Sequence, residues 1–172
     1  MKKALGSWSG MRKYLEKEML AESLKGRIRY NCTRYVGMDD CHVFEVYADG
    51  KLMKRFSWET VNSYFIDRGL TSAKEPFGIR EYWQDFWAIL EKTPISERTE
   101  FTDGEFSRAL AEYRKQPIEE SVNSSDPLVR MFAVLDRRVG KRTLLRLREA
   151  ADQQPEWLRA FYDLRFEAEN MI

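Results

Sequence analysis

One run of the sequence, residues 124–145, restricts the fold more than any other, because it joins a helix start signal, an apolar helical stripe and a dense basic turn. Asp126 followed by Pro127 is typical of a helix N-terminus, since aspartate caps free backbone amides and proline at the first helical position loses no needed hydrogen bond. The apolar stripe after Pro127 predicts a buried helix. The run indicates an architecture rather than a reaction, and we recognise no catalytic or cofactor motif in the 172 residues.

The N-terminal part of the sequence predicts one helix followed by an antiparallel sheet. Apolar residues recur at helical spacing over 8–24, with Ser7 available as an N-cap. Three segments then alternate polar and apolar residues and predict strands, namely 27–35, 43–47 and 52–57. The Asp49-Gly50 pair between the second and third segments is typical of a type I′ turn.

Beyond Ser57 the spacing of apolar residues changes from about 2 to about 3.6, so helices are expected for the remainder of the chain. Ser57 is a suitable cap for the first of them, and Thr102-Asp103-Gly104-Glu105 forms a capping box that opens another. Pro117 and Pro155, like Pro127, stand where new helices begin. The predicted fold class is α+β: an N-terminal helix on a three-stranded antiparallel meander, followed by an all-helical C-terminal half.

A chain of 172 residues is long enough to bury roughly 70% of its unfolded surface, so a single domain over 1–172 is expected. The weakest boundary is the segment 69–78, which is rich in Ser, Lys, Pro and Gly. It allows a subdivision into an α+β part, 1–70, and a helical part, 76–172.

Charge and cysteine content argue against several classes of protein. The 29 Lys and Arg nearly balance the 28 Asp and Glu, so the whole molecule lacks the positive field of a general nucleic-acid binder. No segment approaches 18 apolar residues and no signal peptide is recognisable, so we expect a cytoplasmic protein without a membrane partner. Cys32 and Cys41 would lie about three residues out of register in a hairpin, and no disulfide between them is expected.

Any catalytic triad or dyad in this chain depends on His42, because it is the only histidine. Cys32 can face His42 across the predicted hairpin, which leaves a thiolate dyad as a third functional hypothesis, although a buried structural cysteine is the commoner case. Two cysteines and one histidine at this spacing do not match zinc sites. We therefore predict no catalytic, metal or cofactor-binding residues, and the balance leans away from an enzyme.

The basic turn is a better candidate site. Its cations are Arg137, Arg138, Lys141 and Arg142, and residues 126–148 carry seven basic against two acidic side chains. Residues 97–120 carry seven acidic against four basic ones, so charge is segregated along the chain. Cations at the end of a helix can bind phosphates or an acidic protein face. The favoured interpretation is instead that they pair with the acidic segment of the same molecule.

Two other surfaces are candidates for binding. A sheet-face patch of Arg27, Arg29, Tyr35 and Arg55 is suited to stacking bases or contacting a protein, although such a face is ordinarily just solvated. The aromatic residues of the next helix usually belong to a core. Where they are exposed, they are of the types found at the energetic centres of protein interfaces, the candidates being Tyr82, Trp83 and Trp87.

Two resemblances extend this reading. The Asp-Pro-x-Val-Arg-x-x-Ala pattern that opens 126–148 resembles a single HEAT-type helical repeat unit. More broadly, the chain resembles a family of small, uncharacterised bacterial proteins through the segments 8–13, 26–35, 49–50 and 135–142. The resemblance implies a bacterial, single-domain protein and carries no activity or site with it.

We recognise no set of base, nucleophile or metal-ligating residues that a catalytic function would need. The leading hypothesis is therefore a non-enzymatic cytoplasmic protein-binding module, such as an inhibitor or immunity-type partner. It would use exposed aromatic side chains and the segregated charge. The alternative is nucleic-acid binding through the basic turn and the sheet face, with an affinity that falls steeply with salt. Another protein is therefore the first partner expected, nucleic acid the second, and a homodimer is compatible with the sequence.

Overall fold

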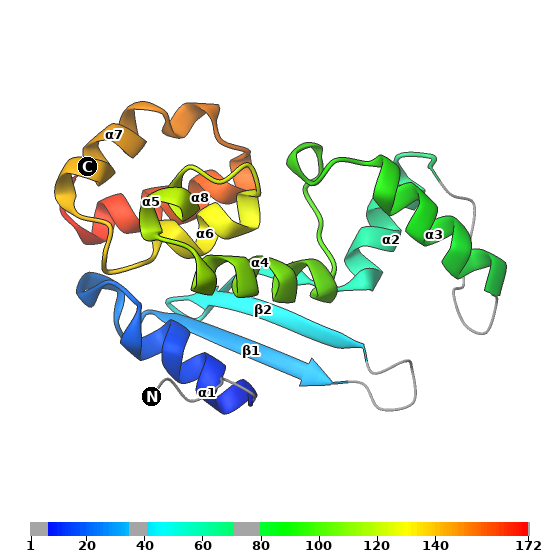
Figure 1. Ribbon diagram of the computed structural model, residues 1–172, viewed down its shortest axis with the longest axis horizontal. Coiled ribbons are helices and arrows are strands. Elements are labelled where there is room, and N and C mark those ends of the chain that lie inside the picture. Colours follow the sequence, from blue (N-terminus) through cyan, green and yellow to red (C-terminus); the bar gives the residue numbers. More distant parts are fainter. Residues whose placement is uncertain (1–6, 35–40, 71–79, 172) are drawn as a thin grey trace.

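The computed structural model describes residues 7–34, 41–70 and 80–171. Within these ranges it contains an N-terminal helix, a three-stranded antiparallel sheet and then a series of helices (Figure 1). This arrangement confirms the α+β fold class predicted from the sequence. No helix in the described ranges has the length and apolar character needed to cross a bilayer.

The N-terminal helix is shorter than its periodicity predicts. Helix α1 (Trp8–Lys13) is capped as expected by Ser7, whose hydroxyl accepts a backbone N–H three residues further on at 3.2 Å. The chain then forms a π-helical turn, η1 (Tyr14–Glu18), and, after a break, a 3-10 turn, η2 (Glu22–Leu24). The prediction of one continuous helix over 8–24 is therefore wrong.

Backbone hydrogen bonds to a distant turn interrupt this helix. The N–H of Ala21 donates to the carbonyl of Leu135 at 2.9 Å, and the N–H of Arg137 donates to the carbonyl of Met19 at 2.8 Å. They flank an isolated β-bridge between Leu20 and a residue of the basic turn. The Ala21 amide and the Met19 carbonyl, which a continuous helix would use for its own hydrogen bonds, thus bond to this distant turn instead.

The sheet forms where the alternating segments predict it. Its strands are β1 (Ile28–Arg34), β2 (His42–Ala48) and β3 (Lys51–Phe56), in the order β1-β2-β3 with both pairs antiparallel. The turn between β2 and β3 has Asp49 at φ 50° and Gly50 at φ 79°, the two positive φ angles that a type I′ turn requires.

The register of β1 against β2 keeps the two cysteines apart, as predicted. Cys32 lies opposite Phe44, which is three residues beyond Cys41. No disulfide joins Cys32 to Cys41. Tyr35, which was assigned to the sheet-face patch, lies outside the described residues.

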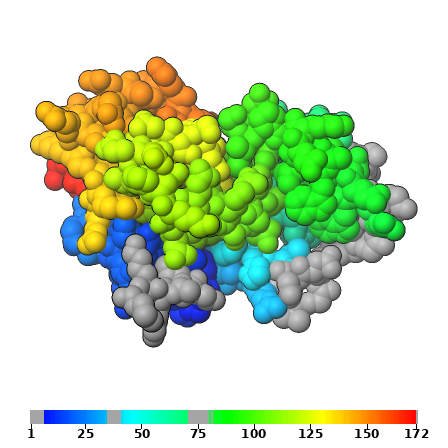
Figure 2. All heavy atoms as spheres, in the orientation of Figure 1, coloured from blue at the N-terminus to red at the C-terminus, as the bar shows by residue number. Residues whose placement is uncertain are grey.

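Helices α2 (Trp58–Asp67) and α3 (Arg80–Lys92) form an arm, the α2–α3 arm, with a hydrophobic cluster of its own. Ser57 caps α2 as predicted, its hydroxyl accepting the Thr60 N–H at 3.2 Å. The buried members of this cluster are Trp58, Val61, Phe65, Tyr82 and Phe86. The arm occupies the right-hand end of the molecule in Figures 1 and 2.

The chain beyond residue 94 is helical with short connections. Its elements are η3 (Ile95–Glu97), α4 (Asp103–Lys115), α5 (Ile118–Val122), α6 (Pro127–Val134), α7 (Lys141–Glu149), η4 (Ala151–Gln153) and α8 (Glu156–Ala168). The capping box of α4 is complete: the Thr102 hydroxyl accepts the Glu105 N–H at 3.1 Å, and the Glu105 carboxylate accepts the Thr102 N–H at 3.0 Å. Pro127 lies in the first turn of α6, and Pro117 and Pro155 are the N-caps of α5 and α8, so all three proline-based helix starts are confirmed.

The larger hydrophobic core, the main core, joins the sheet to the C-terminal helices. Helix α4 packs on β2, α8 packs on β3, and α6 contacts both helices. Buried residues of this core run from Leu15 to Met171, so it draws on both sides of the 69–78 segment. Helix α8 is also tied back to the N-terminal segment, because the Ser23 hydroxyl donates to the Glu169 carboxylate at 2.7 Å.

Candidate functional site

A buried carboxylate holds the basic turn in place. Asp136 is 1% exposed and accepts the backbone N–H of Arg138 at 2.7 Å and its guanidinium Nη2 at 2.8 Å. The Tyr113 hydroxyl of α4 donates to the same carboxylate. From α8, Arg165 donates to the carbonyl oxygens of Val134 and Val139 and of Asp136 itself, at 2.8 to 2.9 Å. We call this arrangement the Asp136 hub. Within it, the Arg138 guanidinium has a structural role, because it is hydrogen-bonded to the buried carboxylate.

The hub fixes the protonation of its members. Hydrogen bonding to Asp136 raises the pKa of Arg138, which stays charged. Burial, and then the charge of Asp136, raise the pKa of Tyr113, so this hydroxyl stays neutral and remains a donor. Burial lowers the pKa of Arg165, while Glu169 acts in the opposite direction. Every charged group of the hub thus has a partner of opposite charge or a set of backbone acceptors.

The other three cations of the basic turn are exposed. Lys141 and Arg142 begin α7, where the helix dipole is positive, and do not lie at the end of a helix as the sequence reading assumed. Within the described parts of the chain, the ion pair that joins the basic segment to the acidic one is Arg146 to Glu119, at 3.5 Å. The interpretation that the basic turn pairs with the acidic segment therefore holds for Arg146 but not for the four residues singled out.

The sheet-face patch is largely neutralised by neighbouring carboxylates. Arg27 donates two hydrogen bonds to Asp49, at 2.8 and 3.0 Å, and Arg55 donates two to Glu45, at 2.9 and 3.1 Å. Hydrogen bonding in the first pair raises the pKa of Arg27 and lowers that of Asp49. Arg29 is exposed on β1 and forms no ion pair with any described residue. Among the described members of the patch, Arg29 is therefore the one cation that is not neutralised by an ion pair.

The three aromatic candidates on α3 have different surroundings. Tyr82 is buried, its hydroxyl donates to Asn62, and burial raises its pKa to about 12. Trp83 is half-buried and packs edge-on against Trp58, with ring centroids 5.3 Å apart. Trp87 is 50% exposed. Of the three, Trp87 presents its ring to solvent most fully.

Trp87 forms part of the wall of a groove between the C-terminal end of α3 and the N-terminal end of α4. The groove, here the α3–α4 groove, has a volume of about 520 Å³. Leu90, Ile95 and the carboxylate of Glu91 also line the groove from the side of α3 and η3, and Arg108 lines it from α4. In Figure 1, α3 stands apart from the C-terminal helices, and the connection that includes η3 returns the chain to the start of α4.

A buried ion pair forms the floor of the α3–α4 groove. Arg98 and Glu105 are 3% and 6% exposed and form two parallel hydrogen bonds, one of them at 2.8 Å from Nη1 to Oε1. Arg98 also donates to the carbonyls of Thr93 and Glu100, at 3.3 and 3.2 Å. The pair therefore fastens the 93–100 connection to the first turn of α4. Arg108 Nη2 lies 3.9 Å from Glu105 while its side chain is 66% exposed, which leaves this guanidinium open to a further partner.

Cys32 and His42 do not form the conceivable dyad. The imidazole of His42 stacks on the ring of Phe44, with centroids 5.9 Å apart, and its backbone N–H donates to Asp103 at 3.0 Å. Burial raises the pKa of the Cys32 thiol, whereas a nucleophilic thiol needs a lowered one. In the described ranges, no group of three or more His, Cys, Asp or Glu is placed to hold a metal ion.

Sequence reasoning found some members of the α3–α4 groove but not the groove itself. The helical arc of α3 contains Trp87 and Leu90, and the capping box contains Glu105. Nothing in the sequence indicates that Arg98 pairs with Glu105, because this depends on the path of the connection between them. A second pocket, beside β1, was also missed, since its cations come from separate segments.

The fold and the groove define a class of protein: an α+β domain in which a helical arm and the first turn of α4 border an open groove with an apolar wall. The chain belongs to the SF0329 protein family, whose model matches residues 7–166. This match confirms that the chain belongs to a small family of the kind expected from the sequence, and it bears neither on a bacterial origin nor on the HEAT-type repeat. Comparisons with curated proteins and with solved structures returned no match.

Proposed function

We propose that this protein is a non-enzymatic, cytoplasmic protein-binding module and that its partner docks in the α3–α4 groove. The observation that carries the proposal is the position of Trp87, a large aromatic side chain left 50% exposed beside a concave surface. Tryptophan and arginine are the residue types most enriched among interface residues that dominate binding energy. Trp87 and Arg108 supply one of each, on opposite sides of the same groove.

The groove defines the chemistry of the partner segment. Its wall of Trp87, Leu90 and Ile95 fits an apolar side chain, which would exclude water from the indole ring. The exposed guanidinium of Arg108 fits a carboxylate of the partner, since Arg–carboxylate pairs form two parallel hydrogen bonds. We therefore expect a protein segment with an apolar side chain next to an acidic one. Because the Arg98–Glu105 pair fixes the floor, the site is preorganised, which lowers the entropy cost of binding.

Nucleic-acid binding through the basic turn and sheet face, the alternative, has less support. It requires a continuous track of available cations. Arg27, Arg55 and Arg138 each form hydrogen-bonded ion pairs with carboxylates of the same chain. These three cations of the basic turn and the sheet-face patch are therefore already paired within the chain.

The test is affinity capture with matched variants. The wild-type protein and a Trp87→Ser variant are immobilised at equal amounts and exposed to nuclease-treated lysate, and bound proteins are quantified by mass spectrometry. Leu145→Ser is the control, because Leu145 is also an exposed apolar residue, 39% exposed on α7. A true partner is retained by the wild type and by the control, and is lost with Trp87→Ser.

The same partner should respond to charge. Arg108→Glu places a carboxylate opposite the expected acidic group of the partner. The two negative charges repel each other, so the substitution should raise Kd more at low salt than at high salt, where the repulsion is screened. For a purified partner we expect Trp87→Ser to raise Kd by about 30-fold, the minimum for a residue that dominates an interface. Proteins captured equally by wild type and Trp87→Ser would contradict the proposal, as would recovery only of nucleic acid in samples without nuclease.

A further inference from the structure

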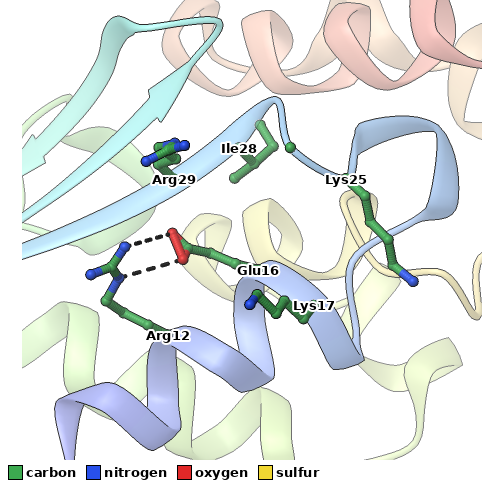
Figure 3. Close-up of a pocket in the computed structure, with 7 residues that line it drawn as sticks. Arg12, Glu16, Lys17, Lys25, Ile28 and Arg29 are labelled. Carbon is green, nitrogen blue, oxygen red and sulfur yellow. Dashed lines mark hydrogen bonds and ion pairs between the residues drawn. The ribbon is translucent and has the colours of Figure 1, made fainter.

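A second pocket, beside the first strand, concentrates positive charge from separate parts of the chain. It has a volume of about 400 Å³, lies between α1, η1 and β1, and has four cations in its lining (Figure 3). They are Arg12, Lys17, Lys25 and Arg29. Glu16 is the one carboxylate in the lining, so the formal charge of the described lining residues is +3.

The one carboxylate in the lining, that of Glu16, already has partners within the chain. Glu16 lies 3.4 Å from the guanidinium of Arg12, toward which it is directed in Figure 3, and it accepts the backbone N–H of Tyr30 at 3.1 Å. Glu16 therefore ties η1 to the free edge of β1 and orients Arg12. It does not reach the other cations of the pocket.

Two of these cations have no carboxylate partner. Lys17 and Arg29 are exposed and form no ion pair with any described residue, while Lys25 pairs with Glu22 outside the pocket lining. By contrast, Arg27, just before β1, and Arg55 on β3 each have a carboxylate partner. Lys17 and Arg29 are thus cations of the pocket whose charge no described carboxylate neutralises by an ion pair.

The backbone of the pocket is also unusual. Glu16 and Lys17 belong to the π-helical turn η1, in which the N–H of Met19 donates to the carbonyl of Tyr14 at 2.9 Å. π-Helical turns are rare and occur frequently at functional sites. Here the turn includes Glu16, which accepts a backbone N–H of β1, and Lys17, and both side chains line the pocket.

We infer that this basic pocket binds a small molecule that carries two or more phosphate groups. Its volume lies within the range of about 300 to 1,000 Å³ typical of small-ligand sites. An excess of three positive charges matches the two to four negative charges of a di- or triphosphate, with Arg29 as a planar fork and Lys17 as a point charge. The site is separate from the α3–α4 groove and does not depend on the function proposed for it.

The experiment is a titration of the full chain with inorganic pyrophosphate, followed by amide NMR and calorimetry. We expect shifts concentrated at Gly26, Ile28 and the η1 turn. The variant Lys17→Ala with Arg29→Ala should raise Kd at least tenfold, and neither change removes an ion pair. Arg142→Ala is the control, because it removes an exposed cation of α7 and should leave Kd unchanged.

Three results would overturn the inference: no shifts at about 10 mM pyrophosphate, equal affinity of the double variant, or shifts spread over α7 as well as the pocket. A single-stranded oligonucleotide provides the second arm. If its affinity exceeds that of pyrophosphate and falls with Arg142→Ala, the basic surface reads a nucleic-acid backbone, and the small-ligand site is rejected. Thermal unfolding of each variant checks that it is folded, and Trp87→Ser should bind pyrophosphate like the wild type.

Discussion

Tyr113 of α4 and Asp136 of the basic turn are joined by a hydrogen bond in which both side chains are buried. The same carboxylate holds Arg138, and the backbone around it holds Arg165 and the segment after η1. Asp136 and its neighbours thus link several parts of the fold: its side chain reaches α4 and Arg138, and the backbone of the turn reaches α8 and the N-terminal segment.

Replacing the carboxylate of the Asp136 hub should destabilise the whole domain. Asp136→Asn removes the charge that pairs with Arg138, and breaking a fully buried pair typically costs about 3 to 5 kcal/mol. Because the Arg138 side chain is 37% exposed, we expect a smaller loss, about 2 kcal/mol in the free energy of unfolding. Urea unfolding followed by circular dichroism measures it. Arg137→Ala is the neighbouring control and should stay within about 0.5 kcal/mol, and similar losses for both variants would disprove a special role for Asp136.

Stability should fall at alkaline pH in a way that depends on Tyr113. Its pKa is raised in the fold, whereas the unfolded side chain titrates near pH 10. Above pH 10 the unfolded state has lost a proton that the folded state keeps, so the free energy of unfolding falls as pH rises, by up to about 1.4 kcal/mol per pH unit. Tyr113→Phe removes this contribution, so its curve between about pH 9 and pH 11 should be flatter than that of the wild type by about one proton. Parallel curves would show that Tyr113 ionises normally in the fold.

The floor of the α3–α4 groove should show strong coupling between its two members. Arg98→Ala leaves the buried carboxylate of Glu105 without its partner and should cost about 3 to 5 kcal/mol. The double variant Arg98→Met with Glu105→Gln removes both charges at similar side-chain volume. It should lose less free energy of unfolding than the summed losses of the single variants Arg98→Met and Glu105→Gln. A double-mutant cycle on the free energy of unfolding measures the difference. An additive result would mean that the pair contributes nothing beyond its separate contacts.

Two glycine substitutions should have opposite signs. Gly50 has φ 79° in the β2–β3 turn, so Gly50→Ala forces a left-handed alanine and should cost about 1 to 2 kcal/mol. Gly104 is helical, and a Cβ there meets only Thr102 Oγ1 at 3.8 Å, an ordinary contact. Gly104→Ala should therefore stabilise the protein by about 0.5 to 1 kcal/mol. Thermal unfolding of both variants checks the signs.

Features that depend on neighbouring residues in the sequence were predicted well. The caps at Ser7, Ser57 and Thr102 and the Asp49-Gly50 turn are set by backbone chemistry within a few residues, so their outcome does not depend on the rest of the fold. The extent of the first helix was not predictable in this way. Its end is decided by two backbone hydrogen bonds with a turn more than 100 residues away in the chain: the Ala21 N–H donates to Leu135, and the Met19 carbonyl accepts from Arg137.

The candidate sites show the same division. The exposed Trp87 lies on the helical arc that the sequence identified, but periodicity alone cannot say which side of that arc faces solvent. Likewise the charges of Arg137 and Arg138 are adjacent in the sequence, yet only Arg138 reaches the buried carboxylate. The basic pocket beside β1 combines α1, η1 and β1 and becomes visible only when these are folded together.

The hydrogen bond between Ser23 and Glu169 spans 146 positions, and Arg27 approaches Glu167 across 140. During synthesis on the ribosome, the sheet is complete long before α8, which covers β3 and contributes to the main core, has been translated. Until then α4 can cover part of the sheet at β2, while the part of β3 that α8 covers stays exposed. For this chain, the main core is completed only when α8 docks on β3 and α6, so its long-range contacts form late in folding.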